Sequence, residues 1–396
     1  MQTENKTPVY NALIYIIACC LGGKKVEKEL LSHVELGNIY TAAKNHSLIA
    51  IAATALEEVQ VFSARASDLK NNSIRKNMLF DSERAEILKE FESRGIKYLP
   101  LKGVFLKDLY PSVGLRQMAD NDIFFDAEYR SVVRDIFLSR GYEIEHYEEG
   151  NHDVYIKKPI FNFEMHVSLF SNGEMADFYE YYKDAFSIAK KDAGHNYSYS
   201  LSDEDFYVYL KAHEYKHYIN SGTGIRSLSD VFVFLKAKES SLDFDYINRE
   251  CEKLGILEYE RLTRELAFKV LNPEVAKEMV LADRGEGESP LTDTEAELLL
   301  GFTDSATYGT REKFLINLVE KERKRYGTSA RKAKLIYILK IIFPDMKYYR
   351  KRFPKASKCK LLIPFLWVIR GFIVVFKRPV RTLRTITEVA KAKTKK

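Results

Sequence analysis

Residues 96–125, IKYLPLKGVFLKDLYPSVGLRQMADNDIFF, contain two short apolar runs that are separated by a glycine turn and a polar loop. Short apolar runs bounded by Gly, Pro or Asp are typical of strands, so Ile96–Leu101 and Asn121–Phe125 predict two strands. Between them the sequence predicts a turn at Lys102-Gly103, a short helix over Val104–Tyr110 and an irregular stretch over Pro111–Ala119.

The residues that follow continue this mixed pattern. Ala127–Arg140 has apolar side chains on one helical face and is followed by Gly141, which predicts an amphipathic helix with a glycine stop. Three strand-like runs come next, at Tyr142–Tyr147, Asp153–Lys157 and Ile160–Leu169. Strands interspersed with helices predict a mixed β-sheet core over residues 95–200.

Helical patterns lie on both sides of this core. Residues 8–92 are helical in pattern, and the helix that begins at Asp81 or Ser82 ends at Arg94, before Gly95. The helical pattern returns at Ser202 and continues to about Leu339. We therefore predict an α+β fold with an N-terminal helical region (1–94), the sheet core (95–200), a C-terminal helical domain (201–340) and a basic amphipathic tail (341–396).

Composition narrows the class of protein. The chain has 396 residues, of which 46% are hydrophobic and 30% charged, and this excludes wholesale disorder, collagen and a disulfide-rich mini-protein. The four cysteines, Cys19, Cys20, Cys251 and Cys359, show no C-x-x-C spacing. We expect a reduced, cytoplasmic protein without a structural zinc cluster.

Basic charge is concentrated in the tail. Residues 341–396 hold 16 lysines and arginines against Asp345 and Glu388, a net charge of +14, so the rest of the chain sums to −8. This tail could contact RNA or an anionic membrane surface. We favour the membrane surface because Leu361–Phe376 is too apolar for an RNA-binding arm. The alternative is a solvated tail with a buried amphipathic helix.

Two apolar runs are tested as membrane or targeting segments. Ala12–Leu21 lacks a basic flank and a cleavage site, so we favour a buried helix over a signal peptide. Leu361–Phe376 is shorter than the roughly 20 residues that a membrane span needs. It also contains Arg370, which would cost about 2.5–3.5 kcal/mol at the bilayer centre. We predict no transmembrane segment and a protein that is cytoplasmic or peripheral at the membrane.

Acidic residues gather at the predicted strands in a pattern that suggests metal chemistry. Asp120 and Asp122 point the same way because strand side chains alternate, and Glu164 shares a face with His166 for the same reason. Three such carboxylates can hold Mg²⁺ on nucleotide phosphates during phosphoryl transfer. Lys102 adds a positive charge at a turn whose backbone N–H groups can face phosphate.

At these residues the chain resembles the polymerase β-like nucleotidyltransferase superfamily, and within it the bacterial uncharacterised nucleotidyltransferase family. The resemblance consists of an LKG turn, a YP pair, an LR pair and a D-x-D strand, all within residues 98–125. The stretches GYEIEH (141–146) and FEMHVSLF (163–170) resemble the strands that follow. The superfamily usually has Gly-Ser or Gly-Gly at the turn, where this chain has Lys102-Gly103. The resemblance covers roughly residues 10–300 and is tight over 96–170.

The resemblance implies a function and a set of roles. Asp120, Asp122 and Glu164 would be the catalytic metal ligands for Mg²⁺ or Mn²⁺, with Glu164 also a candidate base. Lys102 and Gly103 would meet the triphosphate of an NTP, from which a nucleoside monophosphate passes to a hydroxyl. The acceptor would be a polysaccharide precursor, RNA or a protein.

Other residues have two interpretations each. Arg116 either contacts a phosphate or forms a structural salt bridge, and His166 either lines the substrate cleft or is a histidine satisfied at the core edge, which we favour. The resemblance also places His213, His217, Arg226 and Asp230 beside the substrate cleft.

Two alternative functions stay open. His213-Glu214-Tyr215-Lys216-His217 matches the H-E-x-x-H motif of zinc hydrolases, but Lys216 would put a cation beside the metal. The second alternative is a catalytically silent nucleotidyltransferase-like module that binds a nucleotide or a partner. It would arise if Asp120 lay in the loop and Asp122 alone faced the cleft.

Overall fold

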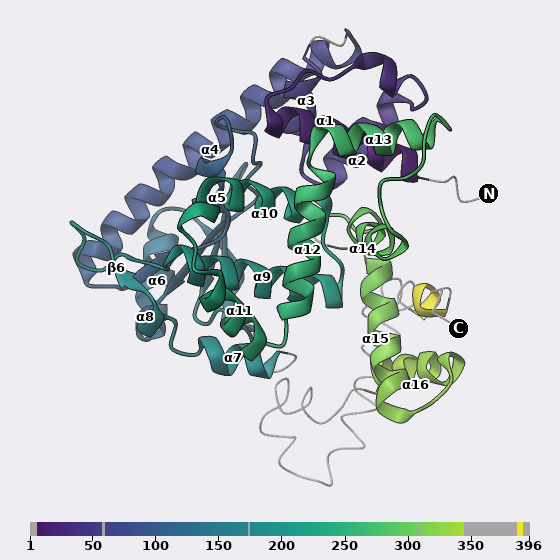
Figure 1. Ribbon diagram of the computed structural model, residues 1–396. Helices are drawn as coiled ribbons and strands as arrows, with labels where there is room; N and C mark the ends of the chain where they lie inside the picture. The colour runs from purple at the N-terminus through teal and green to yellow at the C-terminus, as the bar shows by residue number, and fades with distance from the viewer. Residues whose placement is uncertain are drawn as a thin grey trace. The chain divides into compact units, whose positions relative to one another are not determined.

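A computed structural model of the chain describes residues 6–57, 60–172, 175–307, 309, 311–343 and 386–390 (Figure 1). The chain divides into two compact units. The first contains the residues up to Lys216 together with Thr223–Thr307, and the second contains His217–Gly222 and the described residues after Thr307. The four-part domain division that the sequence suggested stays a prediction.

The first part of the chain is helical. It comprises α1 (Thr7–Gly22), the 3₁₀ turn η1 (Lys28–Leu31), α2 (Leu36–Asn45), α3 (Ile49–Ala55) and the long helix α4 (Gln60–Arg94). The apolar run Ala12–Leu21 lies within α1 and is almost entirely buried, which confirms the expected buried helix. The helix predicted to begin at Asp81 or Ser82 is the last part of α4, which ends at Arg94 as expected.

The central sheet has five strands in the order β1-β2-β5-β4-β3. Its strands are β1 (Tyr98–Pro100), β2 (Asn121–Phe125), β3 (Glu143–His146), β4 (His152–Lys157) and β5 (Phe161–His166). The β2–β5 pair is parallel and the other pairs are antiparallel, so the sheet is mixed. The expected α+β fold is therefore confirmed.

The helical segments around the sheet core follow the sequence pattern closely. The predicted helix over Val104–Tyr110 consists of α5 (Gly103–Leu106) and η2 (Lys107–Leu109). The predicted amphipathic helix consists of η3 (Ala127–Tyr129) and α6 (Arg130–Ser139). Later elements of the core are α7 (Ala176–Tyr182), α8 (Ala185–Ile188) and a small two-stranded sheet, β6 (Lys190–Lys191) and β7 (Tyr199–Ser200).

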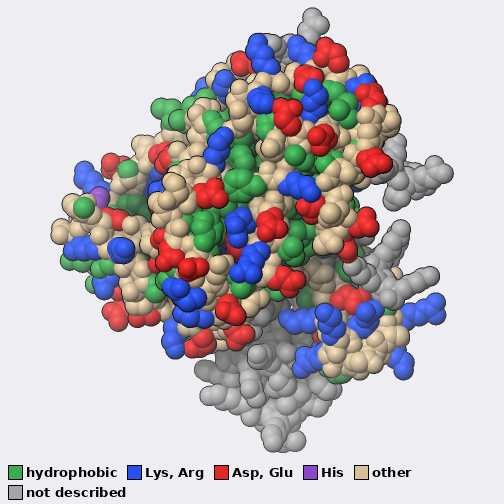
Figure 2. Space-filling view, in the orientation of Figure 1, with side chains coloured by type: hydrophobic (Ala, Val, Ile, Leu, Met, Phe, Trp, Pro, Cys, Tyr) green, Lys and Arg blue, Asp and Glu red, His purple; other side chains and the backbone are tan. Residues whose placement is uncertain are grey.

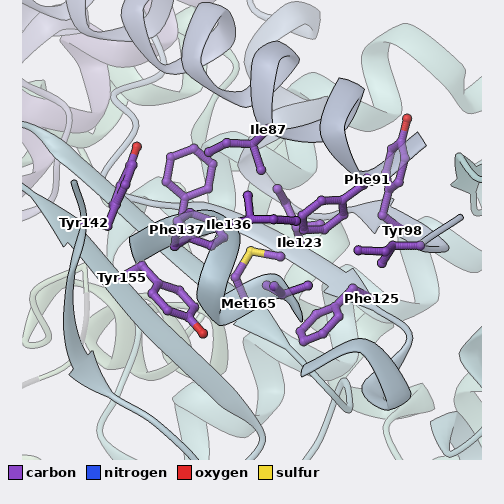
Figure 3. Packing of buried hydrophobic residues seen from close by; sticks show 13 residues of the cluster. Ile87, Phe91, Tyr98, Ile123, Phe125, Ile136, Phe137, Tyr142, Tyr155 and Met165 are labelled. Atoms are coloured by element: carbon purple, nitrogen blue, oxygen red, sulfur yellow. The ribbon is translucent and has the colours of Figure 1, made fainter. Parts of the chain in front are cut away.

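One face of the large sheet forms the hydrophobic core under α4 and α6. Alternate strand residues, among them Ile123, Phe125 and Met165, are fully buried there. Figure 3 shows Ile87 of α4 and Phe137 of α6 converging on these strand side chains. Burying an apolar side chain of this size contributes about 1.5–3 kcal/mol, so this face holds α4, α6 and the sheet together.

Helix α4 also holds the irregular loop before β2. Ser73 Oγ donates to the carbonyl of Gly114 at 2.6 Å, and Asn77 Nδ2 donates to the carbonyl of Arg116 at 3.2 Å. Gly114 has φ +87, and a Cβ there would lie 2.9 Å from the backbone nitrogen of Ile74. A glycine is required for this close approach, and the loop is thereby fixed between α4 and the sheet.

The chain that follows the sheet core is helical, as expected. From Asp203 to Thr303 the chain forms α9 (Asp203–Asn220), α10 (Ile225–Lys238), η4 (Glu239–Ser241), α11 (Phe244–Lys253), α12 (Leu257–Val270), α13 (Pro273–Asp283) and α14 (Asp293–Thr303). Several begin with a side-chain cap: Thr292 and Glu295 form a capping box at α14.

The second unit contains α15 (Arg311–Tyr326) and α16 (Ala330–Ile342), which pack through a small cluster of Leu315, Val319, Ala333 and Val389. Figure 2 shows Lys and Arg side chains over this part, whereas both signs of charge are interspersed elsewhere on the visible face. Of the helices that the structure describes, none is both long and apolar enough to cross a membrane. Most of the basic tail, including Leu361–Phe376, lies outside the described residues.

Candidate functional site

The register of the sheet brings polar side chains of three strands onto the face opposite the core. Asp122 of β2 lies directly beside Glu164 of β5, and His166 of β5 lies directly beside His152 of β4. Directly paired strand residues project to the same face. At these positions the face opposite the core is therefore lined by two carboxylates and two imidazoles.

Asp122 is the centre of the hydrogen bonding at this face. Its Oδ1 accepts a hydrogen bond from Lys102 Nζ at 2.7 Å and lies 2.8 Å from Nε2 of His166. Nε2 of His166 and Nε2 of His152 each lie 3.9 Å from Oε2 of Glu164. The buried Asp122 carboxylate is thus paired from two sides, and Glu164 stands between the two histidines.

Burial and mutual repulsion separate the three carboxyl groups in acidity. Burial and the charge of Asp122 raise the pKa of Asp120. Burial and the charges of Asp122 and Asp120 raise the pKa of Glu164 to about 7. Burial alone would raise the pKa of Asp122 as well, but Lys102 and the hydrogen bond from His166 hold it well below its usual range. The three groups lie close enough to influence one another's charge.

Asp120 stands at the edge of this arrangement. β2 begins at Asn121, so Asp120 precedes the strand and is not fixed by its alternation. Burial and the charge of Asp122 raise its pKa, and the charges of Lys102, Arg226 and Arg116 offset part of that rise. Asp120 therefore belongs to the same electrostatic cluster as Asp122, although the strand itself does not orient it.

The turn between β1 and α5 is strained at Lys102. Lys102 has φ +47 and ψ −111, a conformation that glycine adopts far more readily. The next residue, Gly103, has no room for a side chain, because a Cβ would collide with Nη1 of Arg116 and lie 2.8 Å from Sδ of Met118. The turn thus places the Lys102 ammonium on Asp122 and packs Gly103 against the Arg116 side chain.

Arg116 is engaged in a buried ion pair. Its Nε and Nη2 donate to the two carboxylate oxygens of Asp230 at 2.8 and 3.0 Å, and Tyr110 also donates to Asp230 at 2.8 Å. Arg116 and Asp230 are both more than 90% buried. This geometry supports the salt-bridge alternative for Arg116, and it gives Asp230 the role of anchoring α10 to the loop before β2.

The histidines of α9 do not join the strand cluster. In the described part of the chain, the group of three metal-ligating side chains with donor atoms within 4.8 Å consists of His152, Glu164 and His166, without His213 or His217. Glu214, the base that a zinc hydrolase would need, is buried and accepts hydrogen bonds from Lys211 and Tyr259, both at 2.8 Å. These contacts explain Glu214 as a core residue.

Two residues at the site were not predicted from the sequence. His152 is one residue before the predicted strand Asp153–Lys157, and it is placed by its pairing with His166. Tyr209 of α9 is fully buried, and within the described residues its hydroxyl has no hydrogen-bond partner. Burial raises the pKa of Tyr209, and the charges of Lys102, Asp122 and Glu164 act on it too. No local sequence signal marks either residue, because both depend on packing between distant segments.

Comparison with known proteins gives one result. A family model described as an uncharacterised nucleotidyltransferase matches residues 32–272, which is more than half of the chain. Neither the curated proteins nor the solved structures contain a match. The matched range includes the five-stranded sheet and the polar face described above, and the resemblance to the uncharacterised nucleotidyltransferase family is thereby confirmed.

Proposed function

The chain belongs to the uncharacterised nucleotidyltransferase family, and from this membership we propose that it transfers a nucleoside monophosphate from an NTP to a hydroxyl acceptor. The acceptor oxygen forms a bond to the α-phosphorus, and the bond from that phosphorus to the β-phosphate oxygen breaks, so that pyrophosphate leaves. The observation that carries the proposal is the side-by-side placement of Asp122 and Glu164 on neighbouring parallel strands, with Asp120 within electrostatic reach.

The carboxylates are proposed to hold Mg²⁺ or Mn²⁺. Their oxygens are the donors that these ions prefer. Burial and the neighbouring carboxylates raise the pKa values of Asp120 and Glu164, and a bound cation would favour their ionised forms. When bound, such an ion supplies stabilisation of the charge on the transferring phosphoryl group and on pyrophosphate. The donor chemistry of Asp120, Asp122 and Glu164 therefore fits the group that the family implies.

The remaining roles fall to residues of the same face. Glu164 is the proposed acceptor of the hydroxyl proton, as the partly exposed carboxylate beside Asp122. Lys102 and Gly103 are the proposed triphosphate contacts, with the Lys102 ammonium exchanging Asp122 for a phosphate oxygen. Arg116 is proposed to act on the site indirectly, because its pair with Asp230 packs against Gly103.

The surroundings of this face supply candidates for substrate contacts. Tyr209 offers a buried hydroxyl, and Arg226 is near enough to Asp120 to influence its pKa. His213 and His217 remain proposed cleft residues on α9. The acceptor class (a polysaccharide precursor, RNA or a protein) and the contact of the basic tail with an anionic membrane surface or RNA also remain proposals. So do the cytoplasmic location and peripheral attachment to a membrane.

A second candidate is a silent module that binds nucleotide without turnover. The observation that favours it is the pairing of Asp122: an ammonium and an imidazole already occupy the oxygen Oδ1 that a metal would use. In such a module Lys102 acts as a built-in cation in place of the metal.

Labelled NTPs separate the two candidates. Purified protein and cell lysate are incubated with each α-labelled NTP and Mg²⁺ or Mn²⁺, using wild type, Asp122→Ala and the control Glu145→Gln, which changes an exposed carboxylate of β3. Transfer of label by wild type and the control, but not by Asp122→Ala, supports the transferase. Tight NTP binding without transfer in any lysate supports the silent module.

A further inference from the structure

We propose that His152, Glu164 and His166 bind one divalent transition-metal ion, with Zn²⁺ or Co²⁺ held more tightly than Mg²⁺. Glu164 is also a proposed ligand of the transfer site. The inference therefore rests on the proposed function where it gives this ion a part in nucleotidyl transfer. Metal binding itself needs neither NTP nor acceptor, so it is measured separately from transfer.

The three side chains are brought together by the sheet. His152 and His166 are direct partners in the antiparallel β4–β5 pair, and their ring centroids are 5.0 Å apart. Glu164 lies two residues before His166 on β5 and so projects from the same face. Neighbouring strands hold their backbones in place by ladder hydrogen bonds, so the site is carried on rigid elements and not on loops.

The spacing of the donor atoms suits one ion. The donor atoms of the three residues all lie within 4.8 Å of one another, and both Nε2 atoms are 3.9 Å from Oε2 of Glu164. For metal–ligand bonds of about 2.0–2.2 Å at a tetrahedral angle, two ligand atoms of one ion stand roughly 3.3–3.6 Å apart. The two nitrogen–oxygen separations of 3.9 Å are close to this span, and small rotations of the side chains would bring the three donors onto one ion.

The types of donor favour a transition metal. Mg²⁺ demands oxygen ligands in a near-ideal octahedron, whereas imidazole nitrogen suits Zn²⁺, Co²⁺ and related ions. Two imidazoles with one carboxylate leave open positions for water or substrate, as in sites where a metal activates an oxygen. Nε2 of His166 lies 2.8 Å from Asp122 Oδ1, so binding of the ion by this nitrogen would replace that hydrogen bond.

Asn151 supports the proposed ligand His152 from behind. Its Oδ1 lies 3.3 Å from Nδ1 of His152, and its Nδ2 donates to the carbonyl of Ser168 at 3.0 Å. An oxygen acceptor at Nδ1 keeps the proton there and leaves the lone pair of Nε2 for a metal. Metal-ligating histidines commonly have such a partner on the second nitrogen, and here it is anchored to the backbone.

Metal binding to EDTA-stripped, full-length protein tests the inference. Calorimetry with Zn²⁺ gives the stoichiometry, and the visible spectrum of added Co²⁺ reports nitrogen coordination. We expect one ion per chain, and affinity lowered about 10-fold or more in His152→Gln. His146→Gln is the matched control: it changes an exposed histidine of the same sheet and should bind as wild type does. Equal binding by His152→Gln, or no binding by wild type, overturns the inference.

Two further measurements keep the outcomes distinct. Zn²⁺ should raise the melting temperature of wild type and not that of His152→Gln, whose folding without metal is checked in the same experiment. His152 is partly exposed, with one-third of its side chain accessible, so the substitution is expected to fold. Transfer supported by Mg²⁺ without Zn²⁺ or Co²⁺ binding leaves the proposed function standing and removes this inference. Tight Zn²⁺ binding without transfer under any metal supports this inference and contradicts the proposed function.

Discussion

The two faces of the central sheet are built from alternate residues of the same strands and have opposite character. Toward α4 and α6, Ile123, Phe125, Phe163 and Met165 are fully buried in an apolar core. At adjacent positions of the same strands, Asp122, Glu164 and His166 face the other way. Burial and the charges of Asp122 and Asp120 raise the pKa of Glu164 to about 7. The same strands thus carry side chains that stabilise the fold on one face and side chains that destabilise it on the other.

The contrast between the two faces shows which of them supplies the free energy of folding. On the core face even the buried carboxylate of Asp153 is satisfied: Arg130 Nε donates to it at 2.7 Å and the backbone N–H of Glu148 at 2.8 Å. On the polar face three carboxyl groups repel one another, and one lysine is held in a strained conformation. We expect core-face substitutions to cost stability and some polar-face substitutions to increase it.

The largest expected effect is that of Phe163→Ala on the core face. Phe163 is fully buried, with ring centroids 5.3 Å from Phe137 and 5.8 Å from Tyr142. Truncation removes buried area and leaves a cavity, so we expect a loss of about 3–5 kcal/mol in the free energy of unfolding, measured by urea denaturation. Leu138→Ala, at an exposed position of α6, should change it far less. A loss below about 1 kcal/mol at Phe163 would contradict the contrast between the faces.

The next effect concerns the buried charge on the core face. Arg130→Met leaves the Asp153 carboxylate buried without its cation, and we expect a loss of about 2–3 kcal/mol, because Arg130 is partly reached by water. Arg134→Met is the matched control: Arg134 is also on α6 and also contacts the Tyr147 ring, but its ion pair with Asp135 is exposed. That control should lose much less stability, because solvent screens an exposed ion pair. Equal losses would mean that burial of the charge is not the cause.

The core face could be predicted from the sequence because its determinants are local. The run Asn121–Phe125 has the bounds of β2, and the alternation of FNFEMH correctly separates Glu164 and His166 from Phe163 and Met165. Side-chain period alone fixes which residues share a face. The predicted strands were longer than β1, β3 and β5 because apolar patterns do not mark where ladder hydrogen bonds end.

The polar face was less accessible because its contacts depend on register between strands and on distant segments. The pairing of His152 with His166 depends on the turn between β4 and β5, and no residue type there specifies it. The pair of Arg116 with Asp230 joins residues 114 positions apart, and the sequence offered it only as one of two alternatives. Sequence could name the carboxylates, but it could not show that Lys102 and His166 share Asp122.

A third prediction concerns the polar face, where a substitution should increase the free energy of unfolding. The pKa of Glu164 is raised from the 4.5 of an ordinary glutamate to about 7, so the folded state resists its ionisation. Its cost to stability is absent below pH 4.5, grows as the pH rises toward 7, and is complete above 7. In EDTA at pH 8, Glu164→Gln should therefore raise the free energy of unfolding by about 2 kcal/mol.

The pH profile is the control for this effect. At pH 4.5 the carboxyl is protonated in the folded state, and the difference between Glu164→Gln and wild type should nearly vanish. Glu145→Gln, at an exposed position of β3, should match wild type at both pH values. A stability difference that does not change with pH would show that the substitution acts through packing and not through charge.

The smallest expected effect isolates the backbone strain of the polar face. Lys102→Ala and Lys102→Gly both remove the ammonium from Asp122, so they differ only in the Cβ at a residue with φ +47 and ψ −111. Relief of this conformation favours glycine, and we expect Lys102→Gly to be more stable than Lys102→Ala by about 1 kcal/mol in urea denaturation. At Val104, inside α5, the order should reverse, with glycine less stable than alanine by about 1 kcal/mol. If both positions favour alanine, the turn is not strained, and the excess free energy of the polar face lies in its charges alone.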